Sequence, residues 1–173
     1  MALKVTLMSA AAAMLATAAN AQEGPEWRYG PIFEEFGPHV PVEGVENFAL
    51  DTEFSVAFDV AEKAEEGKRN RGFESAARFI NMHASHGVEP ERMRLAVVVH
   101  GGAVKDLLDV EDNASRDMVI QLLDYGVRFI VCGQSAGAQG IGSDQLVEGV
   151  EMELSAMTAH AKLQQRGYTV NPF

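Results

Sequence analysis

One short run, LAVVVH at residues 95–100, constrains the fold of this chain more than any other feature. It is apolar without interruption until its last residue, so it lacks the alternation of polar and apolar residues expected of a strand with one solvent-exposed face. A strand that is apolar on both sides is typical of the centre of a parallel sheet, which helices cover on both faces. The run therefore predicts a central strand of an α/β protein.

Strand and helix patterns alternate on both sides of this run. In order, the sequence predicts a strand at 53–60, a helix from Phe73 to Ala84, the strand at 95–100, a helix opened by Asn113 and Ser115 and closed by Gly126, a strand at 127–132, a short helix after Ser143, a short strand near Val150, a helix from Ser155 to Gly167 and a last strand in YTV. Such alternation predicts a three-layer α/β sandwich, with a mainly parallel sheet of about five strands and helices on both faces.

The first 21 residues have the pattern of an export signal. Lys4 precedes an apolar, alanine-rich stretch, and Ala19-Asn20-Ala21 is a small-x-small cleavage site. The stretch is shorter than the ~20 apolar residues of a membrane-spanning helix. We therefore expect cleavage after Ala21, a periplasmic location and no membrane span.

Residues 22–48 differ in composition from the domain predicted at 49–173. Four of the six prolines lie here among glycines and aromatic residues, a mixture that prevents a long helix but provides side chains to bury. The segment is interpreted as an extended N-terminal arm. It packs on its own domain or on a neighbouring subunit, or it is a flexible leader.

Charge and cysteine content exclude several classes of protein. The sequence holds 14 Lys and Arg against 25 Asp and Glu, a net charge of −11, which argues against nucleic-acid binding. Cys132 is the only cysteine, so no intramolecular disulfide can form. Its thiol is free, buried, capped or paired with another chain.

Two chemically active residues are predicted to end strands. His100 ends the run at 95–100 and Cys132 ends the run at 127–132. If these strands are neighbours, both residues line one crevice at the carboxyl edge of the sheet, where open α/β proteins bind ligands. A thiol followed by glycine N–H groups and a helix N-terminus favours the thiolate. The alternative is that Cys132 is a small apolar core residue.

Gly133 to Gly137 also fits the G-x-S-x-G pattern of serine hydrolases. Ser135 would then be the nucleophile, His100-Gly101-Gly102 the oxyanion loop, and Asp144 and His160 the other triad members. Against this, we expect the helix after Cys132 to be delayed by GAQGIG, and few residues follow Ser135. His83 and His86 stand three apart without a third ligand of suitable spacing, so we expect no metal and no cofactor.

Several segments, taken in order, resemble the DsrE/DsrF-like family, in particular its exported branch. They are GFESAARFINMHASHGV, LAVVVHGGAVKDLL, GVRFIVCGQSAGAQGI and GVEMELSAMTAHAKLQQRGYTV. The resemblance covers residues 53–171. It implies an α/β sandwich that assembles into homo-oligomers, and a cysteine after a central strand that carries sulfur as a persulfide, as in DsrE subunits and the related Tus relay proteins. Those relay proteins work in the cytoplasm, whereas this chain is predicted to be exported.

Three hypotheses follow. The first is a periplasmic sulfur-handling protein, in which Cys132 holds a persulfide, His100 tunes the thiolate, and Gly101, Gly133, Gln134 and Ser135 surround the sulfur. Its partners would be copies of itself and a sulfur donor or acceptor protein. The second is a non-catalytic oligomeric protein that binds a small ligand or anion, with a structural Cys132. The third is the serine hydrolase.

Overall fold

The computed structural model describes residues 24–171, so the predicted signal segment 1–21 lies outside the described residues. Five parallel strands form one sheet in the order β4-β3-β2-β1-β5. They are β1 (Phe54–Val60), β2 (Met93–Val99), β3 (Arg128–Cys132), β4 (Glu151–Glu153) and β5 (Thr169–Asn171). The predicted parallel sheet is confirmed, with the run at 95–100 supplying the middle strand β2.

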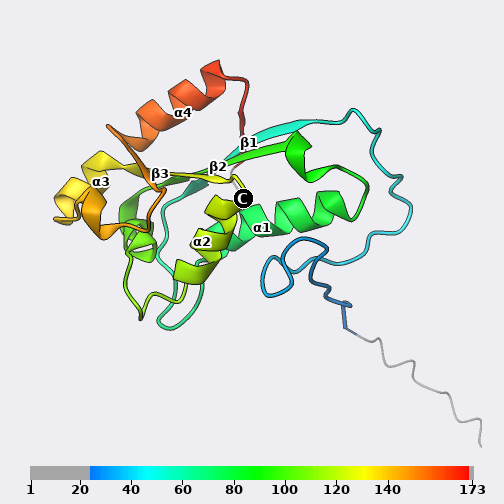
Figure 1. Cartoon of the computed structure of the whole chain (residues 1–173), viewed down its shortest axis with the longest axis horizontal. Coiled ribbons are helices and arrows are strands. Elements are labelled where there is room, and N and C mark those ends of the chain that lie inside the picture. The colour runs from blue at the N-terminus through cyan, green and yellow to red at the C-terminus, as the bar shows by residue number, and fades with distance from the viewer. Residues whose placement is uncertain (1–23, 172–173) are drawn as a thin grey trace, which may run out of the picture.

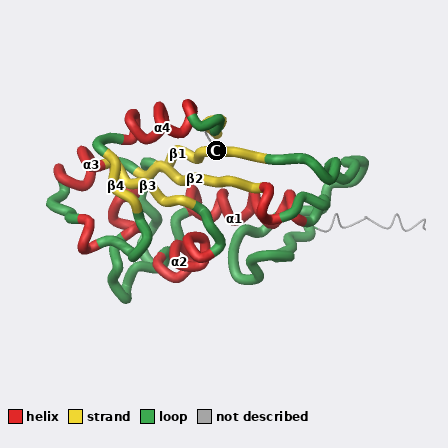
Figure 2. Tube along the Cα trace, turned by 45° about the horizontal axis from the view of Figure 1, so that its top comes forward, coloured by secondary structure: helices red, strands yellow, loops and turns green. Residues whose placement is uncertain are grey.

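Helices cover both faces of this sheet, as Figures 1 and 2 show. The α-helices are α1 (Arg71–Ala84), α2 (Arg116–Asp124), α3 (Gly133–Ala138) and α4 (Ala156–Gln165), and three 3₁₀ segments are η1 (Pro90–Arg92), η2 (Gly101–Leu107) and η3 (Ser143–Gln145). Helices α1 and α2 lie on one face and α4 on the other. None of the helices between residues 24 and 171 is both long and apolar enough to cross a membrane.

The two sides of the sheet carry apolar cores of unequal size. The side of α1 and α2 buries large side chains, among them Phe58, Phe73 and Phe129. The α4 side buries a small cluster: Ala57, Ala96, Val98, Ile130, Ala159 and Leu163. Because apolar burial scales with area, α4 gains less stabilisation from packing than α1 does. Polar contacts with the sheet therefore matter more for the position of α4.

Residues of the N-terminal arm pack against α1 of their own domain. Phe33 and Phe36 are buried. Asn81 of α1 is fully buried as well, and both the oxygen and the nitrogen of its side-chain amide form hydrogen bonds with the backbone of the arm. Its oxygen accepts from Ile32 and Phe33 N–H, and its NH₂ donates to the carbonyls of Phe33, Phe36 and Gly37. In the single chain, residues 32–37 of the arm are thus held against the domain.

Candidate active site

The strands that end in His100 and Cys132 are neighbours. Val99 of β2 lies opposite Val131 of β3, so the two residues that follow reach the carboxyl edge at the same level. Val98 and Ile130, two positions earlier, belong to the core under α4. Since side chains alternate along a strand, His100 and Cys132 belong to that same face. The topology therefore places both residues at one edge, beneath α4.

The thiol of Cys132 is covered but surrounded by hydrogen-bond donors. The residue is 5% exposed and unpaired. Burial raises the pKa of the thiol, yet hydrogen bonds outweigh burial and the net pKa is lowered. These bonds come from the Ser135 hydroxyl and from the backbone N–H groups of Ser135, Ala156 and Gln134. Donors aimed at a sulfur atom stabilise its anion, so this site favours a thiolate.

Two helix starts supply these donors. Helix α3 begins directly after Cys132, so Gln134 and Ser135 lie in its first turn, where backbone N–H groups have no partner within the helix. Ala156 is the first residue of α4, which Ser155 caps by accepting from Thr158 N–H. The sequence analysis named Gln134 and Ser135 among the residues around the sulfur. It did not identify Ala156, although it expected a helix from Ser155.

Glycine is required at the junction between β3 and α3. A Cβ atom on Gly133 would lie 2.8 Å from the carbonyl oxygen of Glu153 and 3.4 Å from that of Leu154. The end of β4 thus passes directly over the residue that follows Cys132. This close approach brings the β4–α4 connection, and with it the N–H of Ala156, to the thiol.

Gly101 and Ser135 link the two strand ends. The N–H of Gly101 donates to the Ser135 hydroxyl oxygen over 3.1 Å, and the side-chain amide of Gln139 donates to the carbonyls of Gly101 and Ser135. Gly101 has φ +55°, and a Cβ there would lie 3.0 Å from the carbonyl oxygen of Ala61. The bond from Gly101 N–H thus holds the Ser135 hydroxyl, which helps to lower the pKa of Cys132.

His100 belongs to a second polar group on the same edge. Its Nε2 lies 3.1 Å from Oδ2 of Asp59, and Nε2 of His160 lies 2.7 Å from Oδ1 of the same carboxylate. Partial burial raises the pKa of Asp59, but the hydrogen bonds from His160 and His100 and the charges of both rings lower it more, so the net pKa is lowered. Asp59 and His160 were not predicted to act together. A signal was present in the single carboxylate near the end of the strand FSVAFDV.

The surroundings of Ser135 and His160 differ from those of a serine hydrolase site. The expected delay of the helix after Cys132 is wrong, since α3 begins at Gly133. However, Ser135 lies inside a regular helical turn with negative φ, not in the strained turn of a nucleophile elbow. The carboxylate partner of His160 is Asp59 and not Asp144. The proposed Ser135–His160–Asp144 triad is therefore not assembled.

His83 and His86 each form a hydrogen bond with a backbone carbonyl of α1. Nδ1 of His83 lies 2.7 Å from the Phe79 carbonyl and Nδ1 of His86 lies 3.0 Å from the Met82 carbonyl. Burial lowers the pKa of His83, whose ring stacks on Phe79. In residues 24–171, no three His, Cys, Asp or Glu side chains are grouped so that they could hold a metal ion.

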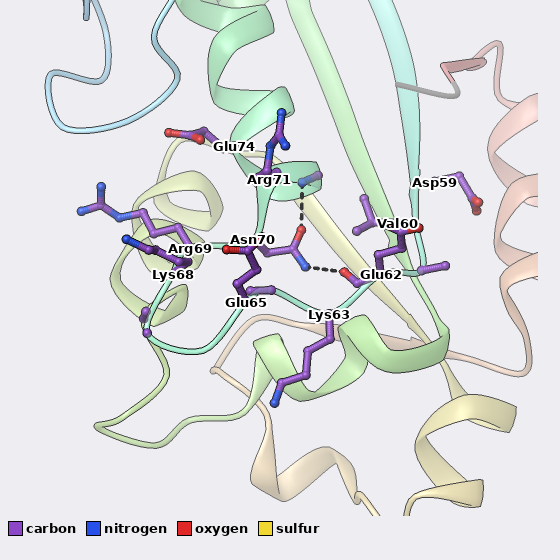
Figure 3. Close-up of a pocket in the computed structure, with 15 residues that line it drawn as sticks. Asp59, Val60, Glu62, Lys63, Glu65, Lys68, Arg69, Asn70, Arg71 and Glu74 are labelled. Atoms are coloured by element: carbon purple, nitrogen blue, oxygen red, sulfur yellow. Dashed lines mark hydrogen bonds between the residues drawn. The ribbon is translucent and has the colours of Figure 1, made fainter.

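A cleft of about 1070 Å³ lies beside β1 and the start of α1 (Figure 3). Four acidic side chains line it (Asp59, Glu62, Glu65 and Glu74), and four basic ones do so as well (Lys63, Lys68, Arg69 and Arg71). The buried Asn70 at its centre is fully engaged, since it caps α1 and donates to Asp106 and Glu62. The cleft is thus balanced in charge, and its lining does not include Cys132.

Comparison with known proteins identifies the family. No curated protein matches this sequence closely. The structure of a protein of unknown function, MTH1491 from Methanobacterium thermoautotrophicum, has a TM-score of 0.56 and 24% identity, covering 70% of this chain and 100% of that one. The ychN protein from E. coli has a TM-score of 0.51 and 21% identity, covering 69% and 100%. These likenesses show the shared fold. The model of the DsrE/DsrF-like family matches residues 55–172, and the chain belongs to that family.

Proposed function

We propose that this protein handles sulfur in the periplasm, with Cys132 as the carrier of a persulfide. One observation carries the proposal: Cys132 lies at the starts of α3 and α4, where hydrogen bonds from the Ser135 hydroxyl and from backbone N–H groups lower the pKa of its thiol. The same donors suit a persulfide anion, because its sulfur atoms also accept hydrogen bonds. Membership of the DsrE/DsrF-like family supports this assignment.

The carrier chemistry needs no oxidant and no cofactor. To load, the Cys132 thiolate attacks the outer sulfur of a donor persulfide, forms a new S–S bond and breaks that of the donor, which leaves as a thiolate. To unload, an acceptor thiolate attacks the outer sulfur on Cys132, and the Cys132 thiolate leaves. Each step exchanges one S–S bond for another, so electrons and charge balance.

The surface at the β4–α4 connection, whose Ala156 N–H bonds to the thiol, suits a sulfur compound or a protein that presents one. Three exposed apolar side chains lie on the β4–α4 connection or next to it: Met152, Leu154 and Met157. In this proposal the protein acts as a homo-oligomer and receives or passes sulfur at this surface.

Intact-mass spectrometry of the protein after incubation with polysulfide tests the proposal. We expect an adduct of one or more sulfur atoms that reductant removes and that Cys132→Ser lacks. The substitution should leave the fold and the assembly intact, as measured by circular dichroism and gel filtration. If the wild type takes up no sulfur, and its thiol reacts with an alkylating reagent only after unfolding, Cys132 is a core residue and the proposal fails.

Export is tested separately. The N-terminal sequence of the protein recovered from the periplasmic fraction should begin at Gln22. Full-length protein found only in the cytoplasmic fraction would contradict the periplasmic assignment and leave the sulfur chemistry to stand on its own.

A second candidate function is binding of a small ligand in the cleft beside α1, with Cys132 as a packing residue. The size of the cleft favours this alternative. Its equal numbers of acidic and basic side chains do not favour an anion over a cation. A ligand that binds equally well to the wild type and to Cys132→Ser, without sulfur uptake by either, would support it.

A further inference from the structure

Three neighbouring strands present a carboxylate, an imidazole and a thiol in a row on one face of the sheet. Asp59 lies near the end of β1, His100 follows β2, and Cys132 ends β3. Asp59 is opposite Val98, and His100 and Cys132 come one residue after the paired Val99 and Val131. His100 is thus the middle member, between a carboxylate and the thiol of the proposed carrier.

The carboxylate of Asp59 is shared between two imidazoles. Oδ2 is bound to His100 and Oδ1 to His160, in both cases through Nε2. When a ring is neutral, the bond to a carboxylate requires the proton on Nε2 and leaves Nδ1 as a base. Nδ1 of His160 is buried and has no hydrogen-bond partner. The His100 side chain is 31% exposed, against 17% for His160, so His100 is the ring that an incoming molecule can reach.

We propose that His100 is the acid–base group that takes up the proton of the acceptor thiol in sulfur transfer from Cys132, and that Asp59 and His160 position its ring. This inference rests on the proposed function and deepens it. It assigns roles to Asp59 and His160 and gives His100 a task other than deprotonating Cys132. That task is the more useful one, because the donors around Cys132 already favour its thiolate.

The step balances as follows. Nδ1 of His100 takes the proton from the acceptor thiol, whose thiolate attacks the outer sulfur of the Cys132 persulfide. The S–S bond to Cys132 breaks, the acceptor leaves as a persulfide, and Cys132 remains as a thiolate. The imidazolium of His100 is stabilised by the Asp59 carboxylate until it returns its proton to solvent.

The titratable groups of this cluster and its neighbourhood come from β1, β2, β3 and α4 or from the residues that directly follow them. From β1 and the residues that follow it come Asp59, Glu62 and Lys63, which line one end of the cleft. His100 follows β2, Cys132 ends β3 and His160 lies on α4. Among the described residues, the ion pairs of Asp59 are those with His100 and His160.

The test separates loading of sulfur from its transfer. Protein loaded with polysulfide is mixed with free cysteine as acceptor between about pH 5 and 8, and loss of the adduct is followed by mass. We expect His100→Gln to load like the wild type and to transfer about 100-fold more slowly. Asp59→Asn should slow transfer at least about tenfold and flatten its pH profile, since the ring is no longer held or stabilised.

The role of His160 is tested by a pair of variants. The side-chain amide of glutamine can donate to Asp59 in place of Nε2, so His160→Gln should transfer close to the wild-type rate, whereas His160→Ala should be slow. Asp109→Asn and His86→Gln serve as matched controls, because Asp109 pairs with Arg116 and His86 binds the Met82 carbonyl, and neither is bonded to Asp59, His100 or His160. Thermal unfolding of every variant identifies losses caused by misfolding.

The outcomes distinguish the two proposals. A wild type that loads no sulfur overturns the proposed function and this inference with it. A wild type that loads and transfers, with His100→Gln and Asp59→Asn equal to it over the whole pH range, overturns this inference alone. Equal loss in His160→Gln and His160→Ala would overturn the positioning role of His160.

Discussion

Replacing Ser135 with alanine tests whether its hydroxyl holds Cys132 as a thiolate. In the structure this hydroxyl accepts from Gly101 N–H at 3.1 Å and donates to the thiol. Alanine removes the hydroxyl alone and has the highest helix propensity, so α3 should be retained. The predicted effect is a rise in the pKa of Cys132.

The magnitude follows from the bond that is lost. A hydrogen bond to a charged group contributes about 1.5–3 kcal/mol. Sulfur is a weaker acceptor than oxygen, so we take the lower end, about 1.5 kcal/mol, which is about tenfold in the equilibrium between thiol and thiolate. The thiolate is the reacting species, so the alkylation rate below the thiol pKa should fall by about the same factor.

The assay is the rate of alkylation by iodoacetamide as a function of pH, with Ser143→Ala, which changes an exposed serine in η3, as the control. We expect the midpoint of the Ser135→Ala profile to move to higher pH and that of Ser143→Ala to stay in place. An unmoved midpoint in Ser135→Ala would refute the argument that this hydroxyl stabilises the thiolate. Thermal unfolding accompanies the assay, because Gly101 N–H loses its acceptor at a cost of about 1–2 kcal/mol.

Three further predictions concern stability. Asn81→Ala should lower the free energy of unfolding by about 3 kcal/mol or more in urea titration, because five hydrogen bonds to the arm are lost inside the protein. Gly133→Ala should cost about 1–3 kcal/mol, since the new Cβ would lie 2.8 Å from the Glu153 carbonyl oxygen. Because the Asp59 pKa is lowered in the folded state, the contribution of Asp59 to stability is complete above the ordinary carboxyl pKa and is lost as the pH falls through the lowered one. Asp59→Asn should therefore be less stable than the wild type at about pH 7, and the difference should vanish in acid.

Each of these predictions has a result that contradicts it. For Asn81, an unchanged urea midpoint would mean that the arm adds nothing to the stability of the domain. Gly137→Ala is the control for Gly133→Ala, because no atom lies within 4 Å of its new Cβ and the helix gains about 0.5–1 kcal/mol. Equal effects of the two alanines would refute the close approach of β4. A difference between Asp59→Asn and the wild type that does not shrink as the pH is lowered below the ordinary carboxyl pKa would refute the titration argument.

Much of the fold and part of the site could be predicted from local patterns. The strand at 53–60 is found at Phe54–Val60, and the helix expected from Phe73 to Ala84 is α1. The error in the predicted start of the helix after Cys132 has a simple cause. Glycine is a poor helix former, so GQSAGAQG was not interpreted as a helix. In the tertiary structure α3 forms nevertheless, and its Ala136 is buried in the core.

The sequence by itself determined the alternation of strands and helices, the family, and the placement of His100 and Cys132 at strand ends. These features depend on hydrophobic periodicity within short windows and on recognisable segments. Only the tertiary structure decided which groups meet there. The bond between Asp59 and His160 joins residues 101 positions apart, and the N–H of Ala156 reaches Cys132 across the end of β4. Such meetings depend on the order of strands in the sheet and on how α4 crosses it, which no local pattern encodes.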